Sequence, residues 1–346
     1  MDTIKMFENQ SINNANYNVK RYPYWDNLKF LLIFLVVLCH FIDVKIAKNH
    51  VFKSIYLFVY SFHMPLFIFV SGLFFDKSGK TNRQRAISYF LIYFLIRLFV
   101  TVTRYSLNDT FDFRLFGNEN IGWFIFVLGV YTLITDFIVK SKINLIKLLP
   151  IAFIVGILVG YDKSIGDDFA LSRICIFYPF FLIGVIIDTN VFFIIKESKL
   201  KFIFIILTVL FLLLCFKYSD TSFYKLRYFF TARNSYPKLK LIHWGGVLRL
   251  LAYFITMITS IAIISVIPNK TIPLITQMGS KTMQVYFWHM VFFWILYDMK
   301  ILSKLADSFC GSVLIVLISI FLTVLLSTKP FSFPIRYVTR KEISIE

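Results

Sequence analysis

Residues 21–44 read RYPYWDNLKFLLIFLVVLCHFIDV, a basic and aromatic start followed by an apolar run with a single histidine inside it. In a helix, Lys29 and His40 are eleven residues apart, so they are offset by only about 20° and share a face. The same eleven residues rise roughly 16 Å, about half of a hydrocarbon core of about 30 Å. The stretch predicts a membrane helix with a cation at the membrane surface and an imidazole near the middle. Both residues could instead be structural, with Lys29 snorkelling and His40 a hydrogen-bonded core histidine.

Composition indicates an integral membrane protein. Of the 346 residues, 58% are hydrophobic and 19% aromatic, and the mean hydropathy is +0.73, whereas soluble proteins are about 45–50% apolar. The formal net charge is +18. Lys and Arg nevertheless occur in short clusters between apolar runs. This pattern indicates membrane topology, because a nucleic-acid-binding protein would gather its cations on one patch or stripe. The four cysteines are scattered singly, so we expect neither a disulfide framework nor a metal site.

Ten apolar segments predict an all-α bundle of about ten transmembrane helices without a soluble domain. They are residues 28–45, 54–75, 87–103, 121–139, 143–160, 173–195, 200–216, 247–267, 282–298 and 311–328. We expect residues 1–27 to form a basic and aromatic N-terminal segment, 28–328 the transmembrane domain, and 329–346 a tail. An even number of spans puts both termini on one side. The short loops of that side carry about twice as many Lys and Arg residues as the short loops opposite, which predicts cytoplasmic termini.

Further histidines follow in other apolar segments. The string FHMPLFIFVSG places His63 beside Pro65, at a depth comparable with that of His40 if the first two helices form a hairpin. Alternatively, His63 only hydrogen-bonds a carbonyl freed by the proline. In the ninth segment, MGSKTMQVYFWH ends on His289, which is equally open to a structural or a functional interpretation.

Charged and aromatic side chains supply the remaining candidates. DKSGKTNRQRA, residues 76–86, contains Arg83 and Arg85, which with Arg21, Asp26 and Lys29 form a candidate site for a nucleotide-like donor. Arginine forks match phosphate oxygens, although such a cluster can also be only a topology anchor. The other candidates are Trp123 in IGWFIFVLG, Arg173 in SRICIFYPFFLIG, and Arg249 in the eighth segment, where a charge needs a partner or a water-filled cavity.

The long loop 217–246, KYSDTSFYKLRYFFTARNSYPKLKLIHWGG, mixes cations with aromatic residues. Aromatic faces stack on sugar rings and cations attract acidic glycans, so the loop is a candidate acceptor surface. It could equally be an interfacial segment lying on the membrane.

Taken in order, these strings resemble the membrane-bound acyltransferase family 3, in particular its fucose 4-O-acetylase-like branch, over nearly the whole chain. The resemblance implies a bacterial cell-membrane enzyme that transfers acetyl from cytoplasmic acetyl-CoA, a co-substrate, to a sugar hydroxyl of a surface, capsular or exopolysaccharide. We therefore expect no bound cofactor, and as partners a polysaccharide or lipid-linked glycan and membrane lipids. The scattered cysteines and dispersed cations already predict no metal and no nucleic-acid partner. The resemblance also implies that Lys29 and His40 are the essential pair. The position of Lys29 is often Arg in the family.

Histidine suits acyl transfer because it exchanges a proton, or carries an acyl group, near neutral pH. His40 is the first candidate and His63 the second, and Asp43 could orient the His40 imidazole or be merely solvated. A transporter or flippase for lipid-linked sugars is the rival hypothesis, since intramembrane His and Arg also suit a substrate pathway. The sequence shows no related halves, which disfavours it. A sensor or scaffold would leave the shared face of Lys29 and His40 unexplained.

Overall fold

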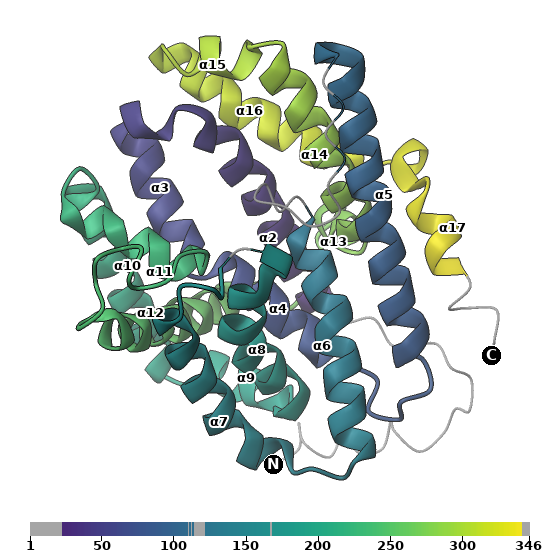
Figure 1. Cartoon of the computed structure of the whole chain (residues 1–346), viewed down its shortest axis with the longest axis vertical. Helices are drawn as coiled ribbons and strands as arrows, with labels where there is room; N and C mark the ends of the chain where they lie inside the picture. Colours follow the sequence, from purple (N-terminus) through teal and green to yellow (C-terminus); the bar gives the residue numbers. More distant parts are fainter. Residues whose placement is uncertain (1–22, 110, 112, 114–121, 167, 341–346) are drawn as a thin grey trace.

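The computed structural model describes residues 23–109, 111, 113, 122–166 and 168–340, which form a helical bundle (Figure 1). No strand occurs in these residues, in agreement with the predicted all-α class. Helices satisfy their own backbone hydrogen bonds, which the interior of a membrane requires. Seven helices are long and apolar enough to span: α2 (Pro23–Ile42), the pair α3 (His50–Tyr60) and α4 (His63–Leu73) counted together, α5 (Asn82–Asn108), α6 (Trp123–Lys140), α10 (Leu200–Tyr218), α12 (Gly245–Val266) and α16 (Phe309–Leu326).

Three predicted spans take other forms. Helices α8 (Leu171–Ile186) and α9 (Asn190–Glu197) meet at 92° and make an eighth span only if they are counted as one. Helix α7 (Leu145–Leu158) has 14 residues and α14 (Thr282–Asp298) has 17. The count of ten therefore stays a prediction. The shorter elements are η1 (Asp43–Lys48), η2 (Val159–Tyr161), η3 (Asp168–Ala170), η4 (Ser222–Leu226), α11 (Arg227–Thr231), α13 (Ile275–Gly279), α15 (Ile301–Leu305), η5 (Lys329–Ser332) and α17 (Ile335–Arg340).

The first helix begins five residues earlier than predicted, at Pro23, a residue favoured in the first turn because its missing N–H costs nothing there. The side chain of Asn27 ties this start to the segment before α13. Its amide donates to the carbonyls of Pro268 (3.0 Å) and Lys270 (2.9 Å), and its oxygen accepts from the Thr276 hydroxyl (2.6 Å). Part of the segment expected to precede the bundle thus belongs to it. At the other end of the chain, α17 packs against α5.

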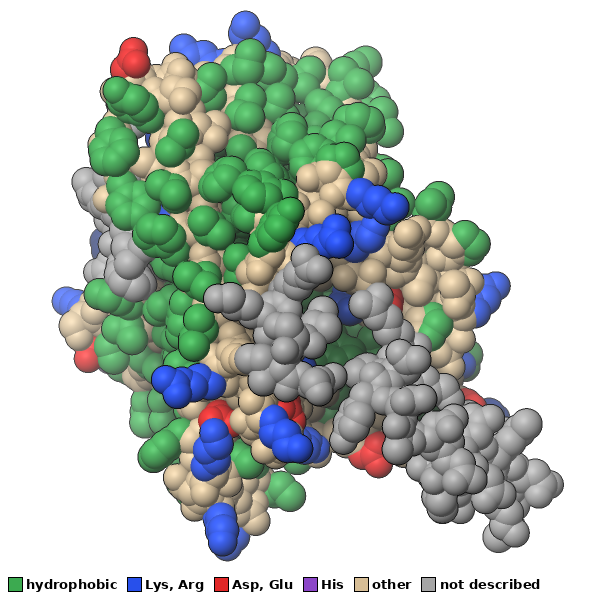
Figure 2. Space-filling view, turned by 90° about the vertical axis from the view of Figure 1, so that its right-hand side faces the viewer, with side chains coloured by type: hydrophobic (Ala, Val, Ile, Leu, Met, Phe, Trp, Pro, Cys, Tyr) green, Lys and Arg blue, Asp and Glu red, His purple; other side chains and the backbone are tan. Residues whose placement is uncertain are grey.

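Helix α2 lies in the centre of the bundle, in contact with α4, α13, α14 and α16 (Figure 1). Its Leu32, Ile33 and Val37 side chains are fully buried. By contrast, α10 exposes large apolar side chains such as Phe202 and Leu213, as a helix facing lipid does. Figure 2 shows a broad apolar surface over the upper half of one face, with many Lys and Arg side chains below it.

Helices α4 and α8 approach each other closely because each has a glycine at the contact. A Cβ on Gly72 would lie 2.2 Å from the carbonyl oxygen of Phe181, and a Cβ on Gly184 would lie 2.2 Å from that of Phe69. Small residues allow membrane helices to pack backbone against backbone. The glycines of FVSG and FLIG therefore allow the second and sixth predicted segments to pack closely.

Hydrogen bonds between helix ends agree with the predicted assignment of these ends to the two sides of the membrane. On the side assigned to the termini, the Asn82 amide donates to the carboxylate of Asp136 (2.9 Å), which links the start of α5 to the end of α6. On the opposite side, Lys53 donates to Asp220 (2.7 Å) and links the start of α3 to the end of α10. In both cases the bond joins helix ends that the predicted topology puts on the same side.

Candidate active site

Two cavities lie along α2. The first, of about 460 Å³, is lined by Lys29 and Arg85. The second, of about 310 Å³, is lined by His40. Tyr286 is the one described residue that belongs to both linings. Helix α2 therefore carries Lys29 to one cavity and His40 to the other.

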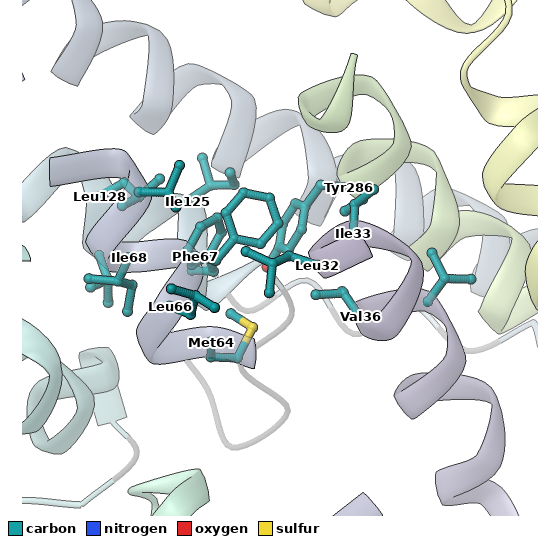
Figure 3. Close-up of a cluster of buried hydrophobic side chains, with 14 of the residues drawn as sticks. Leu32, Ile33, Val36, Met64, Leu66, Phe67, Ile68, Ile125, Leu128 and Tyr286 are labelled. Carbon is teal, nitrogen blue, oxygen red and sulfur yellow. The ribbon is translucent and has the colours of Figure 1, made fainter. Parts of the chain in front are cut away.

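Buried apolar side chains surround Tyr286, the residue shared by the two cavities. Figure 3 shows Tyr286 beside Leu32 and Ile33 of α2, with Phe67 of α4 and Ile125 of α6 close by. All five side chains are buried. Tyr286 touches both spaces, so it lies where the two cavities meet.

The Lys29 cavity brings together two of the predicted donor-site cations. Lys29 Nζ forms a 2.7 Å ion pair with the Asp26 carboxylate and lies 5.4 Å from the centre of the Phe74 ring. Arg85 donates to the Phe74 carbonyl oxygen (2.7 Å). Arg83 is exposed and does not line this cavity, and Arg21 lies outside the described residues.

The turn before α5 is fixed by the carboxylate of Asp76. It accepts hydrogen bonds from the backbone N–H and hydroxyl groups of both Ser78 (2.9 and 2.6 Å) and Thr81 (both 3.0 Å). Burial alone would raise the pKa of Asp76, but these hydrogen bonds hold that pKa well below its usual range. The carboxylate is therefore ionised at any physiological pH, and the turn that sets the position of Arg85 does not depend on pH.

The glycine of MGSKT has a packing role at the same cavity. A Cβ on Gly279 would lie 1.8 Å from the backbone oxygen of Asp26, so only glycine allows α13 to approach α2 there. The following Ser280 and Thr282 line the Lys29 cavity. The string thus forms one wall of the cavity, beside the ion-pair partner of Lys29.

His40 is half-buried and lies beside two aromatic rings. The centre of its ring lies 5.3 Å from that of His289 and 6.1 Å from that of Phe293. Asp43 lines the same cavity, yet no hydrogen bond between Asp43 and His40 is present in the described part of the chain. The predicted orienting role of Asp43 therefore has no direct contact to support it.

The hydrogen bonds of His289 define its tautomer. Its Nδ1 lies 2.7 Å from the Tyr286 carbonyl oxygen and 3.2 Å from that of Val285. Because carbonyl oxygens only accept, Nδ1 carries the hydrogen and Nε2 is an acceptor. The side chain is fully buried, and no described group hydrogen-bonds Nε2.

His63 is held at the break between α3 and α4. Its Nδ1 donates to the Val59 carbonyl (2.8 Å), and the side chain is buried and lines neither cavity. The carbonyl of Ser61, which loses its helical partner because of Pro65, accepts instead from the Thr256 hydroxyl (2.7 Å). His63 therefore braces the break through a different carbonyl from the one that the proline frees.

Trp123 and Arg173 complete the His40 cavity. The Arg173 guanidinium carbon lies 4.5 Å from the centre of the Trp123 ring, a cation–π contact, and both side chains line the cavity. The Tyr131 hydroxyl of α6 donates to the backbone carbonyl of Arg173 (3.0 Å) and fixes the start of α8. Trp123 and Arg173, which the sequence analysis named as separate candidates, are thus in contact beside His40.

The comparison with protein families decides the class of this protein. The acyltransferase domain model matches residues 22–328, nearly the whole chain. The chain belongs to acyltransferase family 3. The comparisons with curated proteins and with solved structures gave no match. The family-level resemblance is confirmed, and the protein is a multi-pass membrane acyltransferase. Its fucose 4-O-acetylase-like branch stays a prediction.

In this acyltransferase Arg249 lies away from both cavities. It is fully buried, donates to the Phe229 carbonyl, and lies 5.4 Å from the centre of the Phe229 ring. Phe229 belongs to α11, so Arg249 anchors the loop between α10 and α12. The Phe229 carbonyl is a hydrogen-bond partner for one nitrogen of the buried guanidinium.

The acyltransferase cavities also contain residues that the sequence analysis did not single out. Thr231 and Arg233, from the aromatic and basic loop, line the His40 cavity, as do Tyr56 and Tyr60, whose rings stack at 4.0 Å. The composition of the loop pointed to a surface but not to single residues. Tyr286 lies on the same face of α14 as two residues that line the cavities, three positions before it and four after it. Helical periodicity in the sequence relates these three residues to each other.

Proposed function

We propose that this membrane acyltransferase moves an acetyl group from acetyl-CoA to a sugar hydroxyl of a bacterial surface polysaccharide or of its lipid-linked precursor. The observation that carries the proposal is the pair of cavities along α2, one with cations and the other with His40, which share Tyr286. We place the Lys29 cavity on the cytoplasmic side of the cell membrane, together with both termini, because the loops of that side are richer in Lys and Arg.

The Lys29 cavity is the proposed donor site. Lys29 and Arg85 would hold the phosphates of acetyl-CoA, with the fork of Arg85 matching phosphate oxygens. Asp26 would repel a phosphate, so its 2.7 Å ion pair makes it a positioning residue for Lys29. The pantetheine arm would extend past Tyr286 and bring the thioester to His40.

His40 is the proposed general base. It takes the proton of the sugar hydroxyl while the hydroxyl oxygen bonds to the thioester carbonyl carbon. The carbon–sulfur bond then breaks, and the imidazolium returns the proton to the CoA thiolate, so the products are an O-acetyl sugar and CoA. Arg173 lines the same cavity, where its positive charge would stabilise the oxyanion of the tetrahedral intermediate.

His289 is a proposed positioning residue for this base. Its ring centre lies 5.3 Å from that of His40, and its Nε2 is an acceptor that no described group hydrogen-bonds. A small rotation of the His40 ring would let it donate to this Nε2, and such a hydrogen bond selects the tautomer whose other nitrogen faces the substrate. His289 would act through His40, without contact to the acetyl group.

Membership in an acyltransferase family favours this function over the transporter hypothesis. The acceptor can be tested in cells by NMR of the surface polysaccharide with and without the gene. Loss of O-acetyl signals on deletion, and their return on complementation, is the expected result. Unchanged signals would rule out acetylation of that polysaccharide.

The role of His40 is tested by His40→Asn with His63→Asn as the matched control. Asparagine keeps a hydrogen bond but cannot exchange a proton near neutral pH. We expect His40→Asn to lower acetyl transfer at least about 100-fold while acetyl-CoA still binds, because general-base catalysis contributes about 10²–10⁴-fold. His63→Asn should keep measurable transfer, since His63 lines neither cavity. Near-normal transfer by His40→Asn would reject the proposed base.

A further inference from the structure

A third cavity, of about 420 Å³, continues from the His40 cavity. Asp43, Tyr56, Thr231 and Arg233 line both spaces. The third cavity lies at the end of the bundle opposite to the loop that precedes α5. We call it the basic vestibule, after the cations that line it: Lys163, Arg227, Arg233 and Lys238.

Positive charge dominates the lining of the vestibule. Asp43 is the one carboxylate among the described lining residues, against four cations. The nearby Asp162 carboxylate accepts from the backbone N–H (2.8 Å) and hydroxyl (2.7 Å) of Ser164, within its own turn. Cations gathered in one hollow repel each other and favour an anion between them.

Membrane topology does not account for these cations. In the proposed orientation the vestibule faces the outside, where short loops are normally poor in Lys and Arg. The loop between α10 and α12 is nevertheless strongly basic. Three of its cations line the vestibule, namely Arg227, Arg233 and Lys238. Their position therefore indicates ligand binding.

Hydrogen bonds from other elements hold the vestibule walls in place. The Ser172 hydroxyl of α8 donates to the Ala232 carbonyl (2.7 Å), next to Arg233. The Tyr236 N–H donates to the Gly160 carbonyl (2.6 Å), which joins the loop to the segment that carries Lys163. The cations therefore stand on fixed backbone, and a ligand does not have to order the loop first.

Arg227 is held in a defined plane. Its guanidinium carbon lies 4.6 Å from the centre of the Tyr224 ring and 4.7 Å from that of Tyr228, and it donates to both phenol oxygens (3.4 and 3.1 Å). A planar arginine fork suits the paired oxygens of a carboxylate or phosphate. Tyr228 also lines the vestibule, where its ring can stack on a sugar.

We infer that the basic vestibule binds an anionic group of the acceptor glycan, a carboxylate or phosphate, and so presents a neighbouring sugar hydroxyl to His40. This inference rests on the proposed function for its meaning in catalysis, although anion binding itself can be measured without acetyl transfer. A carboxylate would come from an acidic sugar of the polysaccharide, and a phosphate from a lipid-linked precursor.

Binding is tested with the full-length protein in nanodiscs of neutral phosphatidylcholine, without acetyl-CoA. Three probes are titrated: a glucuronic-acid oligosaccharide, the same oligosaccharide with its carboxyls reduced to alcohols, and a polyprenyl-diphosphate-linked neutral sugar. We expect at least one anionic probe to bind about tenfold or more tightly than the reduced oligosaccharide, as charge-assisted hydrogen bonds do. The preferred anionic probe identifies the source of the anion.

Variants then locate the binding site. Lys238→Gln and Arg233→Gln should each weaken the anionic probe about tenfold and leave the reduced oligosaccharide unchanged. Lys225→Gln is the matched control, because Lys225 is an exposed cation of the same loop that does not line the vestibule. It should change binding less than twofold. Lys238 is exposed, so we expect Lys238→Gln to fold. This variant still tests the inference if Arg233→Gln does not fold.

Three outcomes would overturn the inference: equal binding of the anionic and reduced oligosaccharides, no binding of either anionic probe, or an equal loss in Lys225→Gln and Lys238→Gln. Acetyl transfer to neutral sugars alone would also overturn it while leaving the proposed function intact. Anion binding that depends on Lys238, in a protein that transfers no acetyl group, would support the inference and reject the proposed function.

Discussion

Neighbouring cations at the start of α5 have different surroundings. Arg85 lines the Lys29 cavity and donates to the Phe74 carbonyl, whereas Arg83 is exposed two residues earlier. Successive residues of a helix point about 100° apart, so residues 83 and 85 cannot face the same cavity. The two arginines are therefore a matched pair for locating the donor site.

We expect Arg85→Gln to raise the KM for acetyl-CoA about tenfold, because a charge-assisted hydrogen bond contributes about 1.5–3 kcal/mol. Arg83→Gln should change this KM less than twofold. Steady-state kinetics of the full-length enzyme in nanodiscs, with kcat and KM resolved for both substrates, give the comparison. Equal effects of the two variants would mean that the cluster attracts the donor only through its overall charge, or only sets topology.

Packing of α4 on α8 links two elements that carry site residues. Helix α4 contributes Phe67 and Ser71 to the Lys29 cavity, and α8 carries Arg173 of the His40 cavity. Their contact depends on Gly72 and Gly184, whose missing Cβ atoms leave room for the backbone of the opposite helix. A shift of α4 would therefore move a wall of the Lys29 cavity, and a shift of α8 would move a wall of the His40 cavity.

Gly184→Ala should lower stability by about 1–3 kcal/mol, the usual cost of overpacking, because its Cβ meets backbone atoms that cannot rotate away. Gly246→Ala is the control. Its Cβ would meet the Tyr161 hydroxyl at 2.8 Å, the far end of a side chain that can move. Thermal unfolding in detergent should show a clear fall in Tm for Gly184→Ala and little change for Gly246→Ala. Equal Tm values would show that α4 and α8 tolerate a wider separation.

The whole molecule has two distinct ends, and the proposed function needs them to face different compartments. The Lys29 cavity and the turn that carries Ser78 belong to one end. The basic vestibule, lined by Ser164, belongs to the other. An enzyme of this form can take its donor from one side of a membrane and its acceptor from the other.

Cysteine labelling in intact cells tests this orientation. Cys310 is exposed, so Cys310→Ser gives the background, in which Ser78→Cys and Ser164→Cys are then made. A membrane-impermeant maleimide should label Ser164→Cys in intact cells, and Ser78→Cys only after the membrane is opened. The opposite pattern would reverse the topology and move the donor site to the outside.

Local sequence determined the class of fold and the outline of the site. Long apolar runs have to form helices in a membrane, because each helix satisfies its own backbone hydrogen bonds. The eleven-residue spacing of Lys29 and His40 fixes their common face through helix geometry alone. The ordered strings also identified acyltransferase family 3, which the family comparison confirms.

Tertiary packing decided which of the candidate residues meet. Arg233 comes much later in the chain than His40. It reaches the His40 cavity because Ser172 and Arg249 anchor the loop that carries it. Thr256 takes the carbonyl freed by Pro65 and leaves His63 to bond another. Such contacts join helices that are far apart in sequence, whereas helical periodicity relates only residues a few turns apart. The cavities, their shared residue Tyr286 and the basic vestibule therefore follow from how the helices pack.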